Sequence, residues 1–164
     1  MKKMKLWSMM MLMLVTLPLM VACGGDDDEG SGTSGYDGVL TITIDGNEHQ
    51  YTTSGEFGLE IVKYFNNSHD LTFVLYSMSG SNFRITFPST WKPSDFVVGY
   101  KDFAKDATKF RLGSQIAKYE SGTATVFKNE GQKMIIKFDN FAFSWLNGKR
   151  TISFDGSAEA LIAQ

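Results

Sequence analysis

Apolar and polar residues alternate in short runs along the chain from residue 36 onward, and turn residues separate the runs. A period of two is typical of strands that bury one face and expose the other. The run 39–44, for example, alternates Leu40, Ile42 and Ile44 with threonines. We count about nine or ten such strands and predict a single all-β, antiparallel domain built from hairpins. The pattern leaves open whether the domain is a β-sandwich or a flattened β-barrel.

The turn signals divide the domain into hairpins. The predicted hairpins pair 39–44 with 49–53, 71–77 with 83–87, 123–128 with 133–145, and 133–145 with 149–162. Two segments depart from simple alternation. The spacing of Leu59, Val62 and Phe65 fits a helix as well as a kinked strand, and we predict a strand. The stretch 104–107 is predicted to form a single helical turn.

The dipeptide Asn147-Gly148 predicts the register of the last hairpin, because Asn-Gly is the strongest signal for a two-residue hairpin turn. Leu146 should then pair with Lys149. Three aromatic residues of the first strand face three residues of the second in this register: Trp145, Phe143 and Phe141 opposite Arg150, Ile152 and Phe154. We expect Phe141 and Phe143 to be core residues, and Trp145 to stack on Arg150 as a surface cation–π pair.

Further upstream, the apolar residues of the same strand have the opposite parity. A bulge of one residue at Asp139-Asn140 would return them to the buried face. Large side chains would then face small ones: Phe138, Ile136 and Met134 opposite Gly156, Ala158 and Ala160. Close packing favours such an arrangement.

The first 22 residues differ from the rest in composition. Three lysines precede an apolar run of 16 residues from Leu6 to Val21. The run is shorter than the roughly 20 residues that a membrane-spanning helix needs, so it is interpreted as a cleaved secretory signal, residues 1–22. The sequence Met20-Val21-Ala22-Cys23 resembles the lipobox of bacterial lipoproteins. This resemblance implies lipidation of Cys23, which would attach the protein to a membrane through acyl chains.

A polar segment, residues 23–35, follows the signal. Its sequence Gly24-Gly25-Asp26-Asp27-Asp28-Glu29 resembles the acidic export signal of Bacteroidota-type surface lipoproteins. The resemblance implies an outer-membrane location facing the cell exterior, and the periplasmic face of that membrane is the alternative. The same composition also suits a flexible, solvated tether, because it has too little apolar area to fold.

The remaining residues, 36–164, form the predicted β-domain. They contain 13 basic and 14 acidic residues, and no basic stripe that could follow a phosphate backbone, so we expect no nucleic-acid partner. Cys23 is the only cysteine, which excludes an intramolecular disulfide. All 13 phenylalanines lie in this domain, so its stability should come mainly from an aromatic and β-branched core.

Candidate catalytic chemistry is sparse. His49 and His69 are the only histidines, and a zinc site would need both of them together with carboxylates. The sequence contains no nucleophile elbow, phosphate-binding loop or zinc-protease motif. We therefore expect neither an enzyme nor a cofactor nor a metal site.

The strongest candidate for a binding feature is the loop 88–95. It holds Trp91 between two prolines, which stiffen the loop. A flat indole could stack on the apolar face of a sugar, with Lys92 and Asp95 at its polar edge. The alternative is that Trp91 folds back and caps one end of the barrel or sandwich.

As a whole, the chain resembles the small, β-rich outer-membrane lipoproteins of unknown function in the Bacteroidota. The resemblance rests on the lipobox with its acidic tether, on 42–46 (ITIDG), and less strongly on 121–126 (SGTATV) and the last hairpin. We predict a surface-exposed, lipid-anchored binding module for a glycan, a host protein or a partner in an uptake complex. The alternatives are a lipocalin-like carrier of a small apolar ligand and an assembly subunit that uses an edge strand.

Overall fold

The structure is a computed structural model that describes residues 37–52, 62–130 and 132–163. These residues belong to one compact unit, Ser34–Gln164. The described residues form nine strands and two single helical turns: β1 (Val39–Ile44), β2 (Asn47–Thr52), β3 (Val62–Phe65), β4 (Asp70–Leu75), β5 (Ser81–Thr86), η1 (Pro93–Asp95), α2 (Phe103–Asp106), β6 (Lys109–Leu112), β7 (Gln115–Asn129), β8 (Lys133–Trp145) and β9 (Arg150–Ala163).

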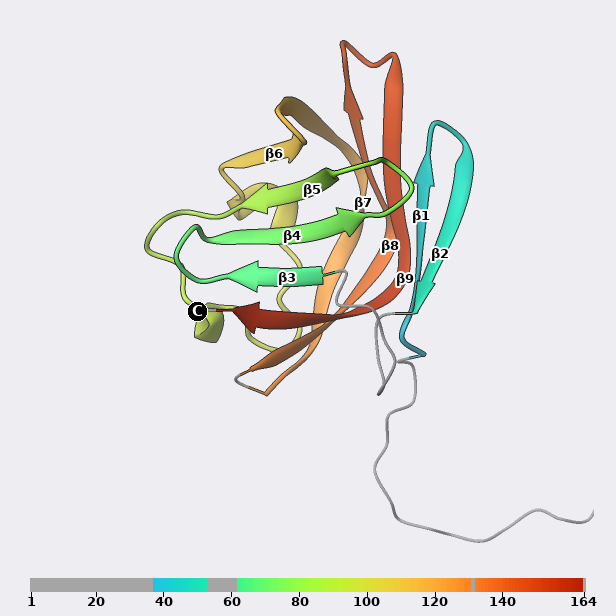
Figure 1. Cartoon of the computed structure of the whole chain (residues 1–164). Helices are drawn as coiled ribbons and strands as arrows, with labels where there is room; N and C mark the ends of the chain where they lie inside the picture. Colours follow the sequence, from blue (N-terminus) through green and yellow to red (C-terminus); the bar gives the residue numbers. More distant parts are fainter. Residues whose placement is uncertain (1–36, 53–61, 131, 164) are drawn as a thin grey trace, which may run out of the picture. The chain divides into compact units, whose positions relative to one another are not determined.

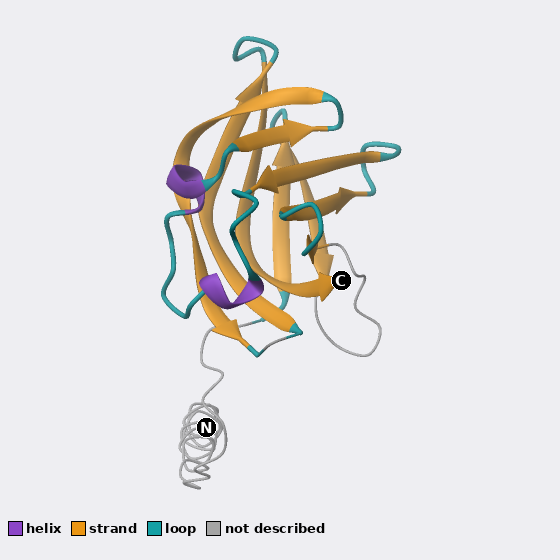
Figure 2. Ribbon diagram, turned by 90° about the vertical axis from the view of Figure 1, so that its left-hand side faces the viewer, coloured by secondary structure: helices purple, strands orange, loops and turns teal. Residues whose placement is uncertain are grey.

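All nine strands join one sheet in the order β2-β1-β9-β3-β4-β5-β6-β7-β8, and β9 also pairs with β8. Strands β3 to β9 therefore close into a seven-stranded barrel, and the β1–β2 hairpin lies outside it against the edge of β9 (Figure 1). Figure 2 shows the strands curving around a common interior. The predicted all-β domain of about nine strands is confirmed, and the sheet forms a barrel.

One strand pairing differs from the antiparallel arrangement that the sequence predicts. β9 pairs in parallel with β3, from Lys63 opposite Leu161 to Phe65 opposite Ala163. The reason is the odd number of strands. When seven strands alternate in direction around a closed barrel, the first and the last point the same way, so one parallel pair is unavoidable.

Strand β9 is long enough to pair with the outer strand β1 and with the barrel strand β3. Its first half pairs with β1, from Ile152 opposite Ile44 to Gly156 opposite Leu40. Its end pairs with β3 and closes the barrel. Gly156 lies at the change of partner with a φ of +99°, and a Cβ atom there would lie 2.4 Å from the carbonyl oxygen of Val39. Only glycine allows this approach of β1 to β9.

The predicted register of the β8–β9 hairpin is confirmed. The structure pairs Trp145 with Arg150, Phe143 with Ile152 and Phe141 with Phe154, and it shifts register between Phe138 and Phe141. Beyond this bulge, large residues again face small ones: Phe138, Ile136 and Met134 opposite Gly156, Ala158 and Ala160. The strands end one residue before the predicted turn, at Trp145 and Arg150.

Aromatic rings fill the barrel interior. Phe154 is fully buried, with its ring centroid 4.6 Å from that of Phe73 and 5.0 Å from that of Phe83. Phe83 continues the cluster to Phe143 at 4.7 Å. Phe141 and Phe143 are 1% and 0% exposed, which confirms that they are core residues.

Trp145 lies deeper than the sequence suggests. The predicted pair with Arg150 is present, with the guanidinium carbon 5.1 Å from the ring centroid. The indole, however, is only 4% exposed, because it closes one end of the core while Arg150 lies over it. The pair is therefore a buried ring under a half-exposed cation.

The structure extends the sequence prediction at β6 and β7. Strand β6 was not predicted, and the predicted strand 123–128 is the second half of the 15-residue β7. The residues Glu120, Ser121 and Gly122 have the composition of a turn, but they form register irregularities opposite the β8 bulge. Gly122 has a φ of +85°, and its Cα packs against the Asn140 backbone.

Of the remaining predictions, some are confirmed and others concern residues outside those that the structure describes. The single helical turn is present as α2, and β3 covers the end of the segment 56–65. The secretory signal, Cys23 and the tether lie outside the described residues. Within the described part of the chain, no helix has the length and apolar character to cross a membrane.

Candidate functional site

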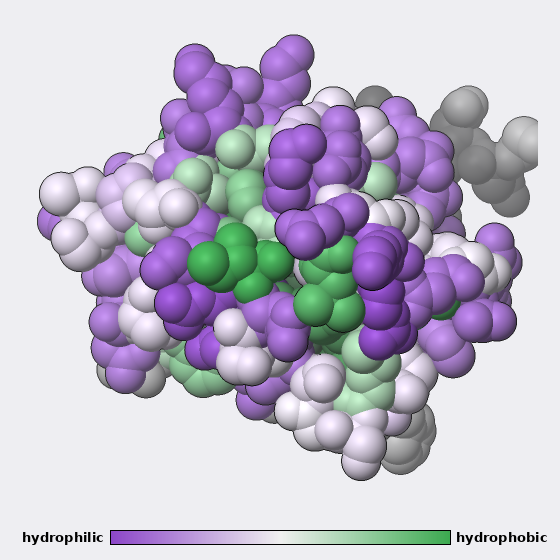
Figure 3. Space-filling model, turned by 90° about the horizontal axis from the view of Figure 1, so that it is seen from above, coloured by the Kyte–Doolittle hydropathy of each residue, from purple (hydrophilic) through white to green (hydrophobic). Residues whose placement is uncertain are grey.

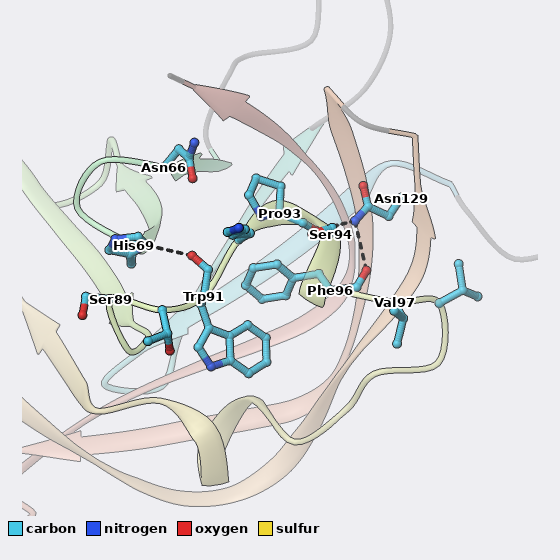
Figure 4. A pocket seen from close by; sticks show the side chains of 12 residues that line it. Asn66, His69, Ser89, Trp91, Pro93, Ser94, Phe96, Val97 and Asn129 are labelled. Carbon is cyan, nitrogen blue, oxygen red and sulfur yellow. Dashed lines mark hydrogen bonds between the residues drawn. The ribbon is translucent and has the colours of Figure 1, made fainter.

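A groove of about 1120 Å³ opens at the end of the barrel where β3, β5 and β7 finish. Three segments line it: the β3–β4 turn at Asn66 and His69, the loop 89–98 after β5, and Asn129 at the end of β7 (Figure 4). These segments are far apart in sequence. The barrel brings them together because alternate strands of a meander end at the same rim.

The loop after β5 is fixed on both sides. Asn129 Nδ2 donates hydrogen bonds to the carbonyl oxygens of Pro93 at 2.8 Å and Phe96 at 3.0 Å. On the other side, His69 Nδ1 lies 3.0 Å from the carbonyl oxygen of Trp91, as a dashed line in Figure 4 shows. A loop held in this way has lost most of its conformational freedom before any ligand arrives, which lowers the entropic cost of binding.

Trp91 is half-buried and lines the groove. Its ring centroid lies 5.2 Å from Phe87, 5.1 Å from Phe96 and 5.2 Å from Tyr100, so it packs on an aromatic cluster at the barrel end. The two sequence-based alternatives are therefore both partly realised. The indole caps this end of the barrel, and it also presents surface to the groove (Figure 4).

Of the two residues predicted to bind a ligand together with Trp91, only Lys92 lies at the groove. Lys92 is exposed and lines the groove. Asp95 does not line it, and its carboxylate Oδ2 instead accepts a hydrogen bond of 2.7 Å from the backbone N–H of Lys92. That bond closes the turn η1, which is the backbone role that aspartate has in many turns. Ligand binding by Trp91 and Lys92 stays a prediction.

The rest of the lining combines polar and apolar groups. Its polar side chains come from both rims: Asn66, His69, Ser89, Thr90, Ser94 and Asn129. On the apolar side, Val97 and Val98 are 60% and 67% exposed. The two adjacent exposed valines and the half-buried indole give the groove an apolar side.

The floor next to the groove is apolar and buried. Tyr64, fully buried, packs edge-on against Phe96 with centroids 5.0 Å apart. Burial, together with the nearby carboxylates of Asp95 and Asp70, raises the pKa of Tyr64 to about 12. Burial also raises the pKa of Tyr100, whose hydroxyl donates a 3.0 Å hydrogen bond to Asp106. Both phenols are therefore neutral, and they act as packing groups.

The sequence did not identify Asn66, His69 and Asn129 as site residues. Asn66 and His69 belong to a polar turn, and Asn129 belongs to the next predicted turn, so each has an ordinary local role. His69 has a positive φ of 55°, which aims its ring at the loop. Only the closure of the barrel places these residues beside Trp91.

A second, smaller depression of about 620 Å³ lies at the opposite end of the β8 and β9 strands. Ile116 and Leu146 line it with Trp145, and they are 70% and 47% exposed. Figure 3 looks down on this end and shows apolar patches within a mainly hydrophilic surface. Within the described residues, no three groups that could ligate a metal ion come together, here or at the groove.

No protein-family model, no curated protein and no solved structure matches the chain. The fold and the groove define a closed, seven-stranded β-barrel with a rigid, tryptophan-containing site at one end. Any assignment of function therefore rests on the chain's own geometry.

Proposed function

We propose that this protein is a non-catalytic carbohydrate-binding module, held at the outer face of an outer membrane by lipid on Cys23. The observation that carries the binding role is the half-exposed Trp91 in a groove of about 1120 Å³ with polar side chains on both rims. Sugars present apolar C–H faces and a ring of hydroxyls. An indole matches the first, and amide, hydroxyl and ammonium groups match the second.

The rigidity of the loop supports this role. Hydrogen bonds from His69 and Asn129 hold the loop backbone at Trp91, Pro93 and Phe96, and the aromatic cluster holds the ring itself. A ligand would meet a surface that is already ordered, so more of the contact energy remains as affinity. The size of the groove suits a short oligosaccharide or a single pyranose with its substituents.

The test is calorimetric titration of the full-length chain, in detergent, with a panel of soluble oligosaccharides. Trp91→Ala should weaken binding of a ligand about tenfold or more, which corresponds to about 1.4 kcal/mol. Trp91→Phe should retain part of the affinity because a ring remains. Tyr76→Ala is the matched control, since Tyr76 is an exposed aromatic residue, 57% exposed, that does not line the groove.

Fluorescence gives an independent readout. The chain from Cys23 onward has two tryptophans, Trp91 and the buried Trp145. Acrylamide should then quench mainly Trp91, and a bound oligosaccharide should protect it. Protection that persists after Trp91→Phe would place the ligand elsewhere and contradict the proposal.

The anchor is tested separately. Mass spectrometry of the protein from membranes should show an N-terminal diacylated Cys23, and Cys23→Ser should abolish both the lipidation and the removal of residues 1–22 that depends on it. A wild-type protein from membranes that keeps residues 1–22 and carries no lipid on Cys23 would contradict the lipid anchor, because the uncleaved apolar segment would then be the attachment.

Two alternatives keep specific but weaker support. A carrier of a small apolar ligand needs space inside the barrel. The aromatic rings packed around Phe154 occupy the interior, so the groove is the better binding site. An assembly subunit needs an edge strand, and β2 pairs only with β1 among the described strands. Its polar sequence, Asn47–Thr52, is typical of edges that avoid association.

A further inference from the structure

Two of the three arginines in the chain lie directly opposite each other on the outer face of the barrel. Arg84 in β5 is the register partner of Arg111 in β6. Their neighbours Phe83 and Phe110 point into the core, so the two guanidiniums lie on the outside. Directly opposed residues in antiparallel strands have Cβ atoms about 5 Å apart, and like charges in such a position destabilise a sheet.

Nothing in the described part of the chain compensates this repulsion. Neither arginine takes part in the ion pairs of the described residues, whereas the third, Arg150, is paired with Asp45. Arg84 Nη2 donates to the carbonyl oxygen of Gly113 at 3.2 Å. The Nε atoms of both Arg84 and Arg111 are buried without a hydrogen-bond partner. An unsatisfied, partly desolvated cation is costly, and here two are adjacent.

Few negative charges lie near the Arg84–Arg111 pair. Thr72 is the register partner of Arg84 on the other side, and it is 6% exposed. Lys109 lies on the same face, two residues from Arg111, and adds a third cation. The nearest carboxylate by register is Asp70, diagonal to Arg84, but the two do not form an ion pair. The pair is separate from the groove, because neither arginine lines it.

We propose that the Arg84–Arg111 pair is a binding site for a tetrahedral oxyanion, a phosphate or sulfate group. Each guanidinium presents Nε–H and Nη–H as a parallel fork that matches two oxygens of such a group. An oxyanion between the two forks satisfies both orphaned Nε–H donors and turns a repulsive pair into two attractive contacts. A carboxylate has only two oxygens and serves one fork fully, so a group with three or four oxygens fits two forks better.

The small number of arginines makes the test direct. A ¹H–¹⁵N spectrum of the full-length chain in detergent should contain three arginine Nε–H signals, which single Arg→Lys variants assign. Titration with inorganic phosphate at constant ionic strength should shift the Arg84 and Arg111 signals saturably. The Arg150 signal is an internal control, because its Nε already donates to Asp45 at 2.7 Å.

The variants separate geometry from charge. Arg84→Lys and Arg111→Lys keep the charge but remove the fork, and each should weaken phosphate binding about tenfold. Lys101→Gln removes an exposed charge elsewhere and should leave binding unchanged. If an arginine variant does not fold, the wild-type titration with signals assigned by through-bond correlation still decides the question. Absence of a saturable shift, equal movement of all three signals, or equal weakening by Lys101→Gln would overturn the proposal.

The source of the oxyanion follows from three parallel titrations: inorganic phosphate, inorganic sulfate, and dihexanoyl phosphatidylglycerol below its micelle concentration. Stronger binding of the phospholipid than of the free ions would support a lipid headgroup as the source. The reverse order would support a free ion or an ester on a soluble molecule. If none of the three titrations gives a response that depends on the arginines, the proposed site is overturned.

Discussion

Asp45 and Arg150 are 105 residues apart in sequence and form an ion pair that ties the outer β1–β2 hairpin to the barrel. Two N–H groups of the guanidinium donate to Asp45 Oδ2 at 2.7 and 2.5 Å, and the backbone N–H of Thr151 donates to Oδ1 at 3.0 Å. Arg150 also lies over Trp145. One side chain therefore links the turn of the first hairpin to the last hairpin and its buried indole.

The first prediction concerns the acid stability of this link. The hydrogen bond from Arg150 holds the pKa of Asp45 below its usual range. The stabilisation is therefore present above the unfolded-state pKa, about 3.9, and is lost as the pH falls through the lower folded-state pKa. Asp45→Asn should lower the free energy of unfolding at pH 7 by up to about 1 kcal/mol, because the pair is partly exposed.

Urea denaturation at pH 7 and pH 3 measures this effect. The difference between Asp45→Asn and wild type should shrink at pH 3. The control is Asp102→Asn, an exposed carboxyl without a side-chain hydrogen bond to its helical turn. An Asp45→Asn variant with the stability of wild type at pH 7 would show that the pair adds nothing.

The second prediction contrasts a buried tyrosine, Tyr64, with a half-buried one, Tyr100. The Tyr64 hydroxyl is buried without a hydrogen-bond partner, whereas the Tyr100 hydroxyl donates to Asp106. Tyr64→Phe should leave the stability at pH 7 unchanged or slightly higher, because it removes an unsatisfied polar group. Tyr100→Phe should cost about 0.5–1.5 kcal/mol, the usual contribution of one hydrogen bond.

Tyr64 also makes the free energy of unfolding depend on pH, and the sign of this dependence is defined. The pKa of Tyr64 is raised to about 12, whereas an unfolded tyrosine titrates near 10. The stabilisation is complete below the unfolded-state pKa and falls as the pH rises from about 10 to 12, by up to about 1.4 kcal/mol per pH unit. Tyr64→Phe should flatten this decrease. Equal slopes for wild type and variant between pH 9 and 11 would contradict the assignment.

The third prediction tests the close approach of β1 to β9. Gly156→Ala should destabilise the fold by about 2 kcal/mol or more, because its Cβ would lie 2.4 Å from the Val39 carbonyl oxygen at a φ of +99°. Gly148→Ala is the matched control. It also has a positive φ, +79°, but no atom lies within 4 Å of its Cβ position. Thermal unfolding of both variants should show the larger loss for Gly156→Ala, and equal losses would mean that the clash relaxes easily.

The fourth prediction concerns the aromatic core. The Phe154 ring contacts four other phenylalanine rings: Phe73, Phe83, Phe138 and Phe143. Phe154→Ala should cost about 3–5 kcal/mol, because it removes buried area and leaves a cavity that tightly packed rings cannot refill. Val98→Ala, at an exposed valine, should change stability by less than about 0.5 kcal/mol. Guanidinium unfolding measures both. A loss below about 1 kcal/mol for Phe154→Ala would mean that the core repacks.

Local pattern was sufficient for much of the fold. The alternation of Leu40, Ile42 and Ile44 with threonines identified the buried face of β1, and Asn147-Gly148 determined the register of the last hairpin. The bulge at Asp139-Asn140 followed from a change of parity within one strand. All of these depend on residues close together in the chain, where the period of a strand and the chemistry of a turn dominate.

The irregular parts of the barrel were harder to predict from the sequence. The first half of β7, which the sequence pattern did not predict, contains Ser121 and Gly122. Their irregularity is matched by the β8 bulge opposite, so the chain stays paired through it. Such compensation between two strands is invisible in either strand alone.

The candidate site divides in the same way. Trp91 and Lys92 stood out because a tryptophan between two prolines is unusual, and both line the groove. His69 and Asn129 did not stand out, although they hold the loop in place. The opposition of Arg84 and Arg111 likewise depends on the pairing of β5 with β6, which no local signal determined.

The sequence by itself therefore determined most of the strands, their buried faces and the register of the last hairpin, because these follow from interactions between near neighbours along the chain. The tertiary structure decided that the sheet closes through the parallel pair of β3 and β9, which residues meet at the groove, and which cations face each other on the outside. These properties depend on contacts between distant segments, and their free energies arise only when the whole barrel has formed.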